Sequence, residues 1–409
     1  MMRDDEGAFE PAGDPYRWVM LGGLWLIYVS FGATSAAIAP LVEPISTDLG
    51  MSHLAMGSVM GAWPLVYIGA AVPCGALLDR IGPRRALTIA AALIGISCAA
   101  RGLAVGHVTL FLAVALFGLG GPLVSVGAPK LISLWFDGRE RGMAMGLYVT
   151  GPAVGGISAL SLTNSVAMPL ADGDWRTVLY AYGALALAAG LIWLCISAHP
   201  TSRLVERRVA AEPRVRSLEV FAALLRVPAV RLVLMLGLGI LFINHALGNW
   251  LPELLRGHGM HPVAAGYWAS VPTAVGVLGA LVIPRLATPA RRHTVMLLLV
   301  VATGAATLLL HFAEALPLTA GLILQGISRG STTSVMMLLL METPEVGPSR
   351  MGAAGGLFFS AAEVGGVLGP LTVGYLSDVS GDFGSALYLL TGICVLNVLI
   401  LNRLARSAR

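Results

Sequence analysis

Long apolar runs alternate with short polar connections along almost the whole chain. A run of about 20 apolar residues spans the hydrocarbon core of a bilayer as an α-helix. Membrane β-barrels show shorter segments of alternating hydrophobicity instead. The pattern therefore predicts an all-α integral membrane protein with twelve transmembrane helices. The expected spans are 18–41, 55–78, 86–106, 109–135, 141–168, 176–197, 231–254, 263–284, 293–312, 316–340, 352–376 and 384–402.

A basic polar stretch, HPTSRLVERRVAAEPRVRSLEV, divides these spans into two sets of six. The sets are alike in sequence, since GLYVTGPAVGG at 146–156 matches GLFFSAAEVGG at 356–366. Repeated halves are a known construction of secondary transporters. We expect two six-helix halves related by pseudo-two-fold symmetry. The expected segments are a cytoplasmic tail (1–16), an N-terminal half (17–197), a cytoplasmic loop (198–230), a C-terminal half (231–403) and a cytoplasmic tail (404–409).

Composition and charge fit this picture. Only 12% of the 409 residues are charged and 56% are hydrophobic. With the N-terminus inside, Arg101, Arg176 and Arg256 fall in outer connections, whereas nearly all other basic residues fall in inner ones. This bias predicts a protein of the cytoplasmic (inner) membrane with both termini cytoplasmic. It also accounts for the net charge of +4, so no nucleic-acid partner is expected.

One predicted helix carries a charge near its middle. Arg329 shares a helix face with Gln325, Thr332 and Thr333, and Glu363 lies at a similar depth on the next helix. A buried ion pair between Arg329 and Glu363 would hold the two helices together. Alternatively, Arg329 binds an anionic substrate while Glu363 carries a proton, since intramembrane ionisable groups mark transport pathways. The two interpretations can coexist.

Further polar and aromatic residues are candidates for the substrate cavity. His245 and Asn249 lie one turn apart and either line a cavity or pack by hydrogen bonding. Lys130, the single lysine of the chain, either extends to the interface or serves substrate binding or gating. Tyr28 and Trp63 are aromatic candidates for the cavity wall. The four cysteines lack metal-ligand spacing, and we expect neither a metal site nor a cofactor.

The stretch GALLDRIGPRRA at 75–86 resembles the loop between helices two and three of the major facilitator superfamily. The resemblance covers essentially the whole chain. It implies that Asp79 anchors the cytoplasmic ends of helices from both halves, near Met351 and Gly352, when that side is closed. These residues would form a gate: Gly75, Asp79, Arg80, Gly82, Arg84 and Arg85, with Arg139 and Arg141 as ion partners.

Two narrower resemblances concern subfamily. GPAVGG resembles the core of a helix-five motif associated with antiporters, but Leu147 stands where that motif has glycine. Gly151, Pro152, Gly155 and Gly156 are therefore expected mainly to allow close helix packing. PKLISLWFDGRERGMAMG and NWLPELLRGHGMHPVAAG are similar to stretches of cyanate and nitroimidazole permeases and of organic-anion porters.

Together these features predict a secondary active transporter of a small, anionic solute, working as a monomer by alternating access with proton coupling. The alternatives are a multidrug exporter of the same fold and a transporter-like receptor. An enzyme is not expected, because the sequence shows no phosphate-binding loop, metal cluster or nucleophile motif.

Overall fold

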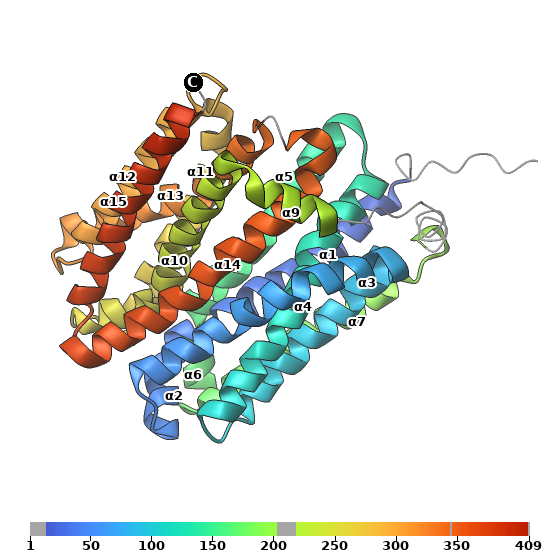
Figure 1. Ribbon diagram of the computed structural model, residues 1–409. Coiled ribbons are helices and arrows are strands. Elements are labelled where there is room, and N and C mark those ends of the chain that lie inside the picture. The colour runs from blue at the N-terminus through green and yellow to red at the C-terminus, as the bar shows by residue number, and fades with distance from the viewer. Residues whose placement is uncertain (1–13, 203–217, 344–345, 408–409) are drawn as a thin grey trace, which may run out of the picture.

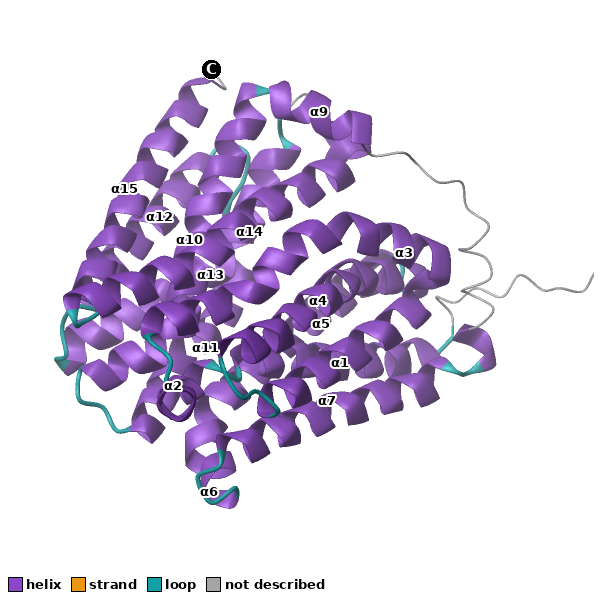
Figure 2. Ribbon diagram, turned by 60° about the horizontal axis from the view of Figure 1, so that its bottom comes forward, coloured by secondary structure: helices purple, strands orange, loops and turns teal. Residues whose placement is uncertain are grey.

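The computed structural model describes residues 14–202, 218–343 and 346–407, and the regular structure in these ranges is entirely helical (Figures 1 and 2). The predicted all-α class is thus confirmed. The longer helices are α1 Tyr16–Ala36, α3 His53–Gly102, α4 His107–Trp135, α5 Gly138–Leu162, α7 Trp175–Ser197, α10 Pro228–Gly257, α11 Pro262–Leu286, α12 Arg292–Leu309, α13 Ala315–Met341, α14 Gly347–Ser380 and α15 Gly384–Ser407. The shorter ones are η2 Ala39–Leu41, α2 Val42–Leu49, η3 Thr163–Ala167, α6 Met168–Leu170 and α9 Leu218–Arg226.

Ten helical stretches of the described chain are long and apolar enough to cross a membrane. One of them, α3, is interrupted at Gly82, whose φ of 80° is the left-handed conformation that glycine adopts without strain. Helix α13, which carries Arg329, is not among the ten. Large apolar side chains face outward around the molecule, including Leu185, Leu278 and Leu298. Such an outward apolar surface suits contact with lipid.

The long helices pack in two groups. Helices α1, α3, α4, α5 and α7 pack on one another and are called the N bundle here; helices α10 to α15 form the C bundle. The bundles meet through α3 against α14 and α5 against α11. Within the N bundle, Gly155 of α5 lies against the Val29 carbonyl of α1, and Gly32 of α1 lies against Pro152. Close backbone approach of this kind requires residues without a large side chain.

Some predicted boundaries differ from the structure. The expected spans 55–78 and 86–106 form a single helix with a break, because the loop between them is only the turn at Gly82. The expected loop 198–230 contains α9, which packs on α10 and α14 (Figure 1). Most of the expected N-terminal tail, part of this loop and the last two residues of the chain (1–13, 203–217 and 408–409) lie outside the described residues. The rest of the expected C-terminal tail, 404–407, continues α15.

The two ends of the contact between α3 and α14 are different. Near the start of α3, which we call the His53 end, Gly57 lies against the Pro370 carbonyl and Gly374 against the His53 carbonyl. Gly75 lies about five helical turns after Gly57, and hence on the same face of α3, but it has no such neighbour within 4 Å. Gly356 of α14 is equally free of close neighbours. The bundles therefore touch at the His53 end and separate toward the Gly82 end.

Candidate substrate cavity

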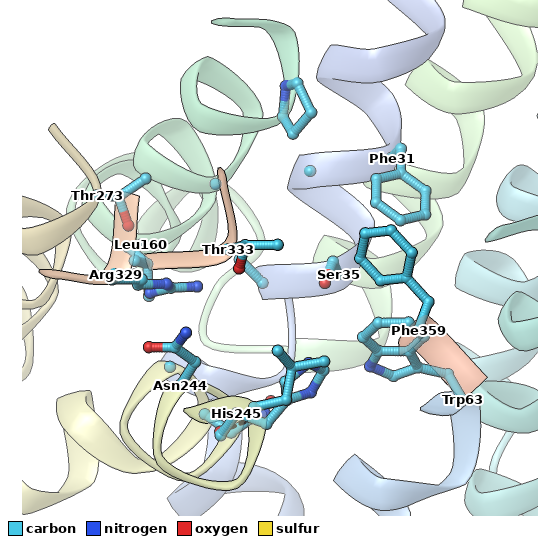
Figure 3. A pocket seen from close by; sticks show the side chains of 17 residues that line it. Phe31, Ser35, Trp63, Leu160, Asn244, His245, Thr273, Arg329, Thr333 and Phe359 are labelled. Atoms are coloured by element: carbon cyan, nitrogen blue, oxygen red, sulfur yellow. Dashed lines mark hydrogen bonds between the residues drawn. The ribbon is translucent and has the colours of Figure 1, made fainter. Parts of the chain in front are cut away.

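A cavity of about 370 Å³ lies between the two bundles (Figure 3). Its walls come from α1, α3 and α5 of the N bundle and from α10, α11, α13 and α14 of the C bundle. Polar side chains, among them Arg329, Asn244 and Thr273, lie on one side of it, and Phe31, Trp63 and Phe359 lie on the other (Figure 3). A concave chamber in which apolar and aromatic side chains meet convergent polar groups is typical of small-molecule sites.

Arg329 is the cation that lines this cavity. Gly326 and Gly330 of α13 lie directly against Pro272 and Gly276 of α11, so the intervening Arg329 is held on the face toward the cavity. The guanidinium lies beside α10, where a Cβ on Gly248 would be 3.2 Å from its Nη2. Arg329 is half-buried and forms no hydrogen bond or ion pair with any described residue. A charge in this position can pair with a solute.

Glu363 does not pair with Arg329 in this conformation, contrary to one of the two interpretations of the sequence. Instead, Oε2 of Glu363 lies 3.5 Å from Nε2 of His245. Glu363 is only 6% exposed, and its Oε2 has no hydrogen-bond partner among the described residues. Gly366 makes room for the pair, because a Cβ there would overlap this oxygen. His245 itself lines the cavity, so the carboxyl group lies one side chain behind the wall.

Of three other predicted binding residues, two line the cavity and one lies outside it. Asn249 lines the cavity and donates from Nδ2 to the His245 carbonyl (2.8 Å). Trp63 also lines it, with its ring 5.3 Å from that of His245, and so brings the N bundle against the C bundle. Tyr28 lies outside the cavity, where its hydroxyl donates to the Val124 carbonyl (3.0 Å) and connects α1 with α4.

Gln325 and Thr332 also lie outside the cavity, although they were expected to share a face with Arg329. Both are buried; Thr332 donates to the Ser328 carbonyl, whereas the Gln325 amide has no hydrogen-bond partner among the described residues. Thr333, also on that predicted face, does line the cavity. Asn244, Ser35, Thr273, Phe31 and Phe359 line it as well, and sequence reasoning missed them. Asn244 carried one available signal, because it lies directly before His245.

The predicted gate residues lie at the Gly82 end, within the N bundle. Asp79 accepts from Nζ of Lys130 on α4 at 2.6 Å, within the N bundle. Its expected contact near Met351 and Gly352 involves side chains outside the described set and stays a prediction. Lys130 is therefore an ion partner of the loop motif and not a cavity residue. Arg141 pairs with Asp137 at 2.7 Å and donates to the Phe136 carbonyl. Arg80 and Arg85 are exposed, Trp193 donates to the carbonyl of Arg84, and the side chain of Arg139 is outside the described set.

A second cavity, of about 470 Å³, lies at the His53 end. Its ionisable lining residues are His53, Glu253, His258, His311 and Asp382. Burial lowers the pKa of His258, which follows the last residue of α10. No group of three His, Cys, Asp or Glu residues in the described chain is arranged to hold a metal ion. Of the residues that line this second cavity, only His53 comes from the N bundle, whereas the central cavity is lined by both bundles. We therefore place the candidate site in the central cavity.

Comparison with known proteins agrees with this geometry. The family model of the Major Facilitator Superfamily matches residues 24–343. The chain belongs to this superfamily, which confirms the resemblance seen in the loop at 75–86. The narrower resemblance to cyanate and nitroimidazole permeases stays a prediction.

The relatives are transporters of varied solutes. An uncharacterized transporter, YycB, of Bacillus subtilis (strain 168) is 27% identical over 91% of this chain and 90% of its own length. A quinolone resistance transporter of Acinetobacter baumannii is 24% identical (93% and 92%). A probable galactarate/D-glucarate transporter of Bacillus subtilis (strain 168) is 23% identical (94% and 91%). The solved structure of a mutant of the nucleoside transporter NupG superposes with a TM-score of 0.78 at 14% identity, covering 94% of this chain and 99% of that one, and shares the fold.

Proposed function

We propose that this protein is a secondary active transporter that moves a small organic anion across the cytoplasmic membrane by alternating access. The observation that carries the proposal is the half-buried Arg329, which lines the cavity between the bundles and has no partner among the described residues. An arginine at the centre of a membrane helix costs about 2.5 to 3.5 kcal/mol on insertion scales, so it is retained where it has a function. A carboxylate solute would supply the missing partner through a bidentate pair.

The proposed topology has twelve spans in two six-helix halves with pseudo-two-fold symmetry. It counts α3 as two spans and includes α13. The excess of Arg in the connections on one side then supports a cytoplasmic location for both termini and for the Gly82 end. In this assignment the central cavity communicates with the cytoplasm while the His53 end is closed. Rocking of the two bundles would expose the same site to the other side.

Proton coupling is proposed for Glu363 together with His245. A buried carboxylate without a hydrogen bond is unfavourable in its charged form, so protonation of the pair would follow its access to water. We expect Glu363→Gln to bind the solute but to lose accumulation driven by a proton gradient. Accumulation by this variant equal to wild type would contradict the role.

The second candidate is export of cationic or amphipathic drugs. The aromatic wall of Phe31, Trp63 and Phe359 and the relation to a quinolone resistance transporter favour it. Against a cationic substrate stands the charge of the cavity, since its ionisable lining residues are Arg329 and His245. A cation would have to bind beside a positive charge, which favours an anion.

A thermal-stability panel distinguishes the candidates. The purified protein would be heated with sugar acids, small carboxylates, inorganic anions, neutral sugars and cationic quinolones. A ligand at 100 times its dissociation constant stabilises the folded state by about 2.7 kcal/mol. We expect stabilisation by a carboxylate that is lost in Arg329→Ala and retained in Arg285→Ala, which removes an exposed arginine of the same bundle. Stabilisation by quinolones alone would support the drug exporter instead.

A further inference from the structure

The start of α3 is held by a side chain from the other bundle. The first amides of a helix have no acceptor within the helix, and side chains or water must satisfy them. In α3, Ser52 caps from within the bundle by accepting from the Ala55 amide at 3.2 Å. The two preceding amides, of His53 and Leu54, donate to Oδ1 and Oδ2 of Asp378 at 3.0 and 2.8 Å. Asp378 lies in the last turn of α14, in the C bundle.

The ring of His53 belongs to the same contact. Its Nδ1 lies 3.3 Å from Oδ1 of Asp378 and 3.4 Å from the hydroxyl of Ser377. The ring also meets Trp250 of α10 at 5.5 Å between centroids. Both carboxylate oxygens of Asp378 thus accept hydrogen bonds from the first turn of α3 in the N bundle. A carboxylate in this place is favoured by the partial positive charge of the helix N-terminus.

We propose that Asp378 is a latch that holds the His53 end closed, and that this latch must release each time the end opens. If the start of α3 and the end of α14 move apart, the amides of His53 and Leu54 lose both acceptor oxygens at once. The carboxylate loses the helix N-terminus as well. Beside the backbone packing at Gly57 and Gly374, closure of this end is therefore stabilised by an acidic residue that does not line the central cavity. Asp378 is a positioning residue in transport, and its role rests on the proposed alternating access.

The test measures distances between spin labels in the full chain, reconstituted in lipid nanodiscs without solute. The four native cysteines are replaced by alanine. One label pair, at the exposed positions 105 and 316, reports on the His53 end; a second, at 143 and 286, reports on the Gly82 end. We expect Asp378→Ala to increase the population with the first pair far apart and the second pair close. Typical losses of a helix cap predict a shift of about fivefold in the ratio of the two populations.

Asp382→Ala is the matched control, because Asp382 follows shortly after Asp378 but its carboxylate accepts from the Gly384 amide of its own bundle. We expect its distance distributions to equal those of wild type. Unchanged distributions in Asp378→Ala, or equal shifts in both variants, would overturn the proposal.

A second variant covers the case in which Asp378→Ala does not fold. Leu54→Pro removes one of the two donors, and proline is tolerated in the first turn of a helix. It should shift the populations in the same direction and by less; an unchanged distribution would contradict the latch. The measurement uses no solute, so its outcome does not depend on which substrate class is correct.

Discussion

Each end of the α3–α14 contact has an aspartate, but the partners of the two aspartates lie in different bundles. At the His53 end, Asp378 of the C bundle accepts two amides of the N bundle. At the Gly82 end, Asp79 of the N bundle pairs with Lys130 of the same bundle. Asp378 lies in the last turn of α14, and Asp79 lies just before the break of α3 at Gly82. In this conformation the carboxylate crosses the interface at the His53 end and stays within its own bundle at the Gly82 end.

The glycines repeat this difference. Gly57 and Gly374 allow backbone contact between the bundles at one end, whereas Gly75 and Gly356 meet nothing at the other. Where both helices carry glycine, they make few van der Waals contacts while they are apart and many when their backbones meet. The free glycines at the Gly82 end are what a second, closed arrangement would use. We infer that the two ends close in turn.

The largest effect is expected from Gly57→Ala, because a Cβ at this position would overlap the Pro370 carbonyl. Overpacking of this kind costs about 1 to 3 kcal/mol. The bundles should separate at the His53 end, and the distance between labels at 105 and 316 should increase. Gly75→Ala, on the same face of α3, is the matched control and should leave that distance unchanged. If both variants behaved alike, the two ends would not differ as described.

A smaller effect of opposite sign is expected from Lys130→Ala. Removing Nζ leaves Asp79 without its partner in the N bundle, so the carboxylate becomes available to the start of α14. The pair is partly exposed, and such pairs contribute about 0 to 1 kcal/mol. The population in which the labels at 143 and 286 are close should increase, by less than about fivefold. A shift toward longer distances would show that Lys130 does not hold Asp79 away from α14.

The smallest effect is expected from Arg256→Gln. Arg256 of α10 pairs at 2.7 Å with Glu43 of α2, a short helix that packs on α3, and so links the C bundle to the N bundle at the His53 end. Glu43 is more than half exposed. The variant should open this end slightly at low ionic strength. The difference from wild type should vanish near 1 M salt, where the screening length is about 3 Å. An effect that persists at high salt would point to packing rather than charge.

The fold class could be predicted from the sequence because the length of an apolar run fixes a membrane helix. The break in α3 at Gly82 falls within the predicted connection between 78 and 86, but its shortness was not predicted, because helix resumes directly after one residue with positive φ. Arg329 could be recognised as a candidate from the sequence, because inserting a charged side chain into the bilayer is energetically unfavourable. Asn244, Ser35 and Phe359 did not, because small polar and aromatic side chains are ordinary in such helices. Their position in the cavity depends on how seven helices meet.

The partners of the charged residues could not be predicted from the sequence either. Asp79 and Lys130 are 51 residues apart, and Asp378 reaches His53 over 325 residues. Their contacts depend on the rotation and crossing of α3 against α4 and α14. For the same reason, the expected pairing of Arg329 with Glu363 rested only on their similar depth in the membrane, because the sequence does not give the rotation of the two helices. In the structure the two side chains point to different neighbours: Glu363 to His245, and Arg329 into the cavity.

The most direct test of the account is solute accumulation by proteoliposomes under an imposed proton gradient. The solute is the carboxylate that stabilises the purified protein most in the thermal panel, and the variants are wild type, Arg329→Ala, Arg329→Lys and Arg285→Ala. We predict accumulation by wild type and Arg285→Ala, a reduced rate for Arg329→Lys because its ammonium lacks bidentate geometry, and none for Arg329→Ala. Accumulation by Arg329→Ala at the wild-type rate would contradict the claim that this arginine recognises the transported anion.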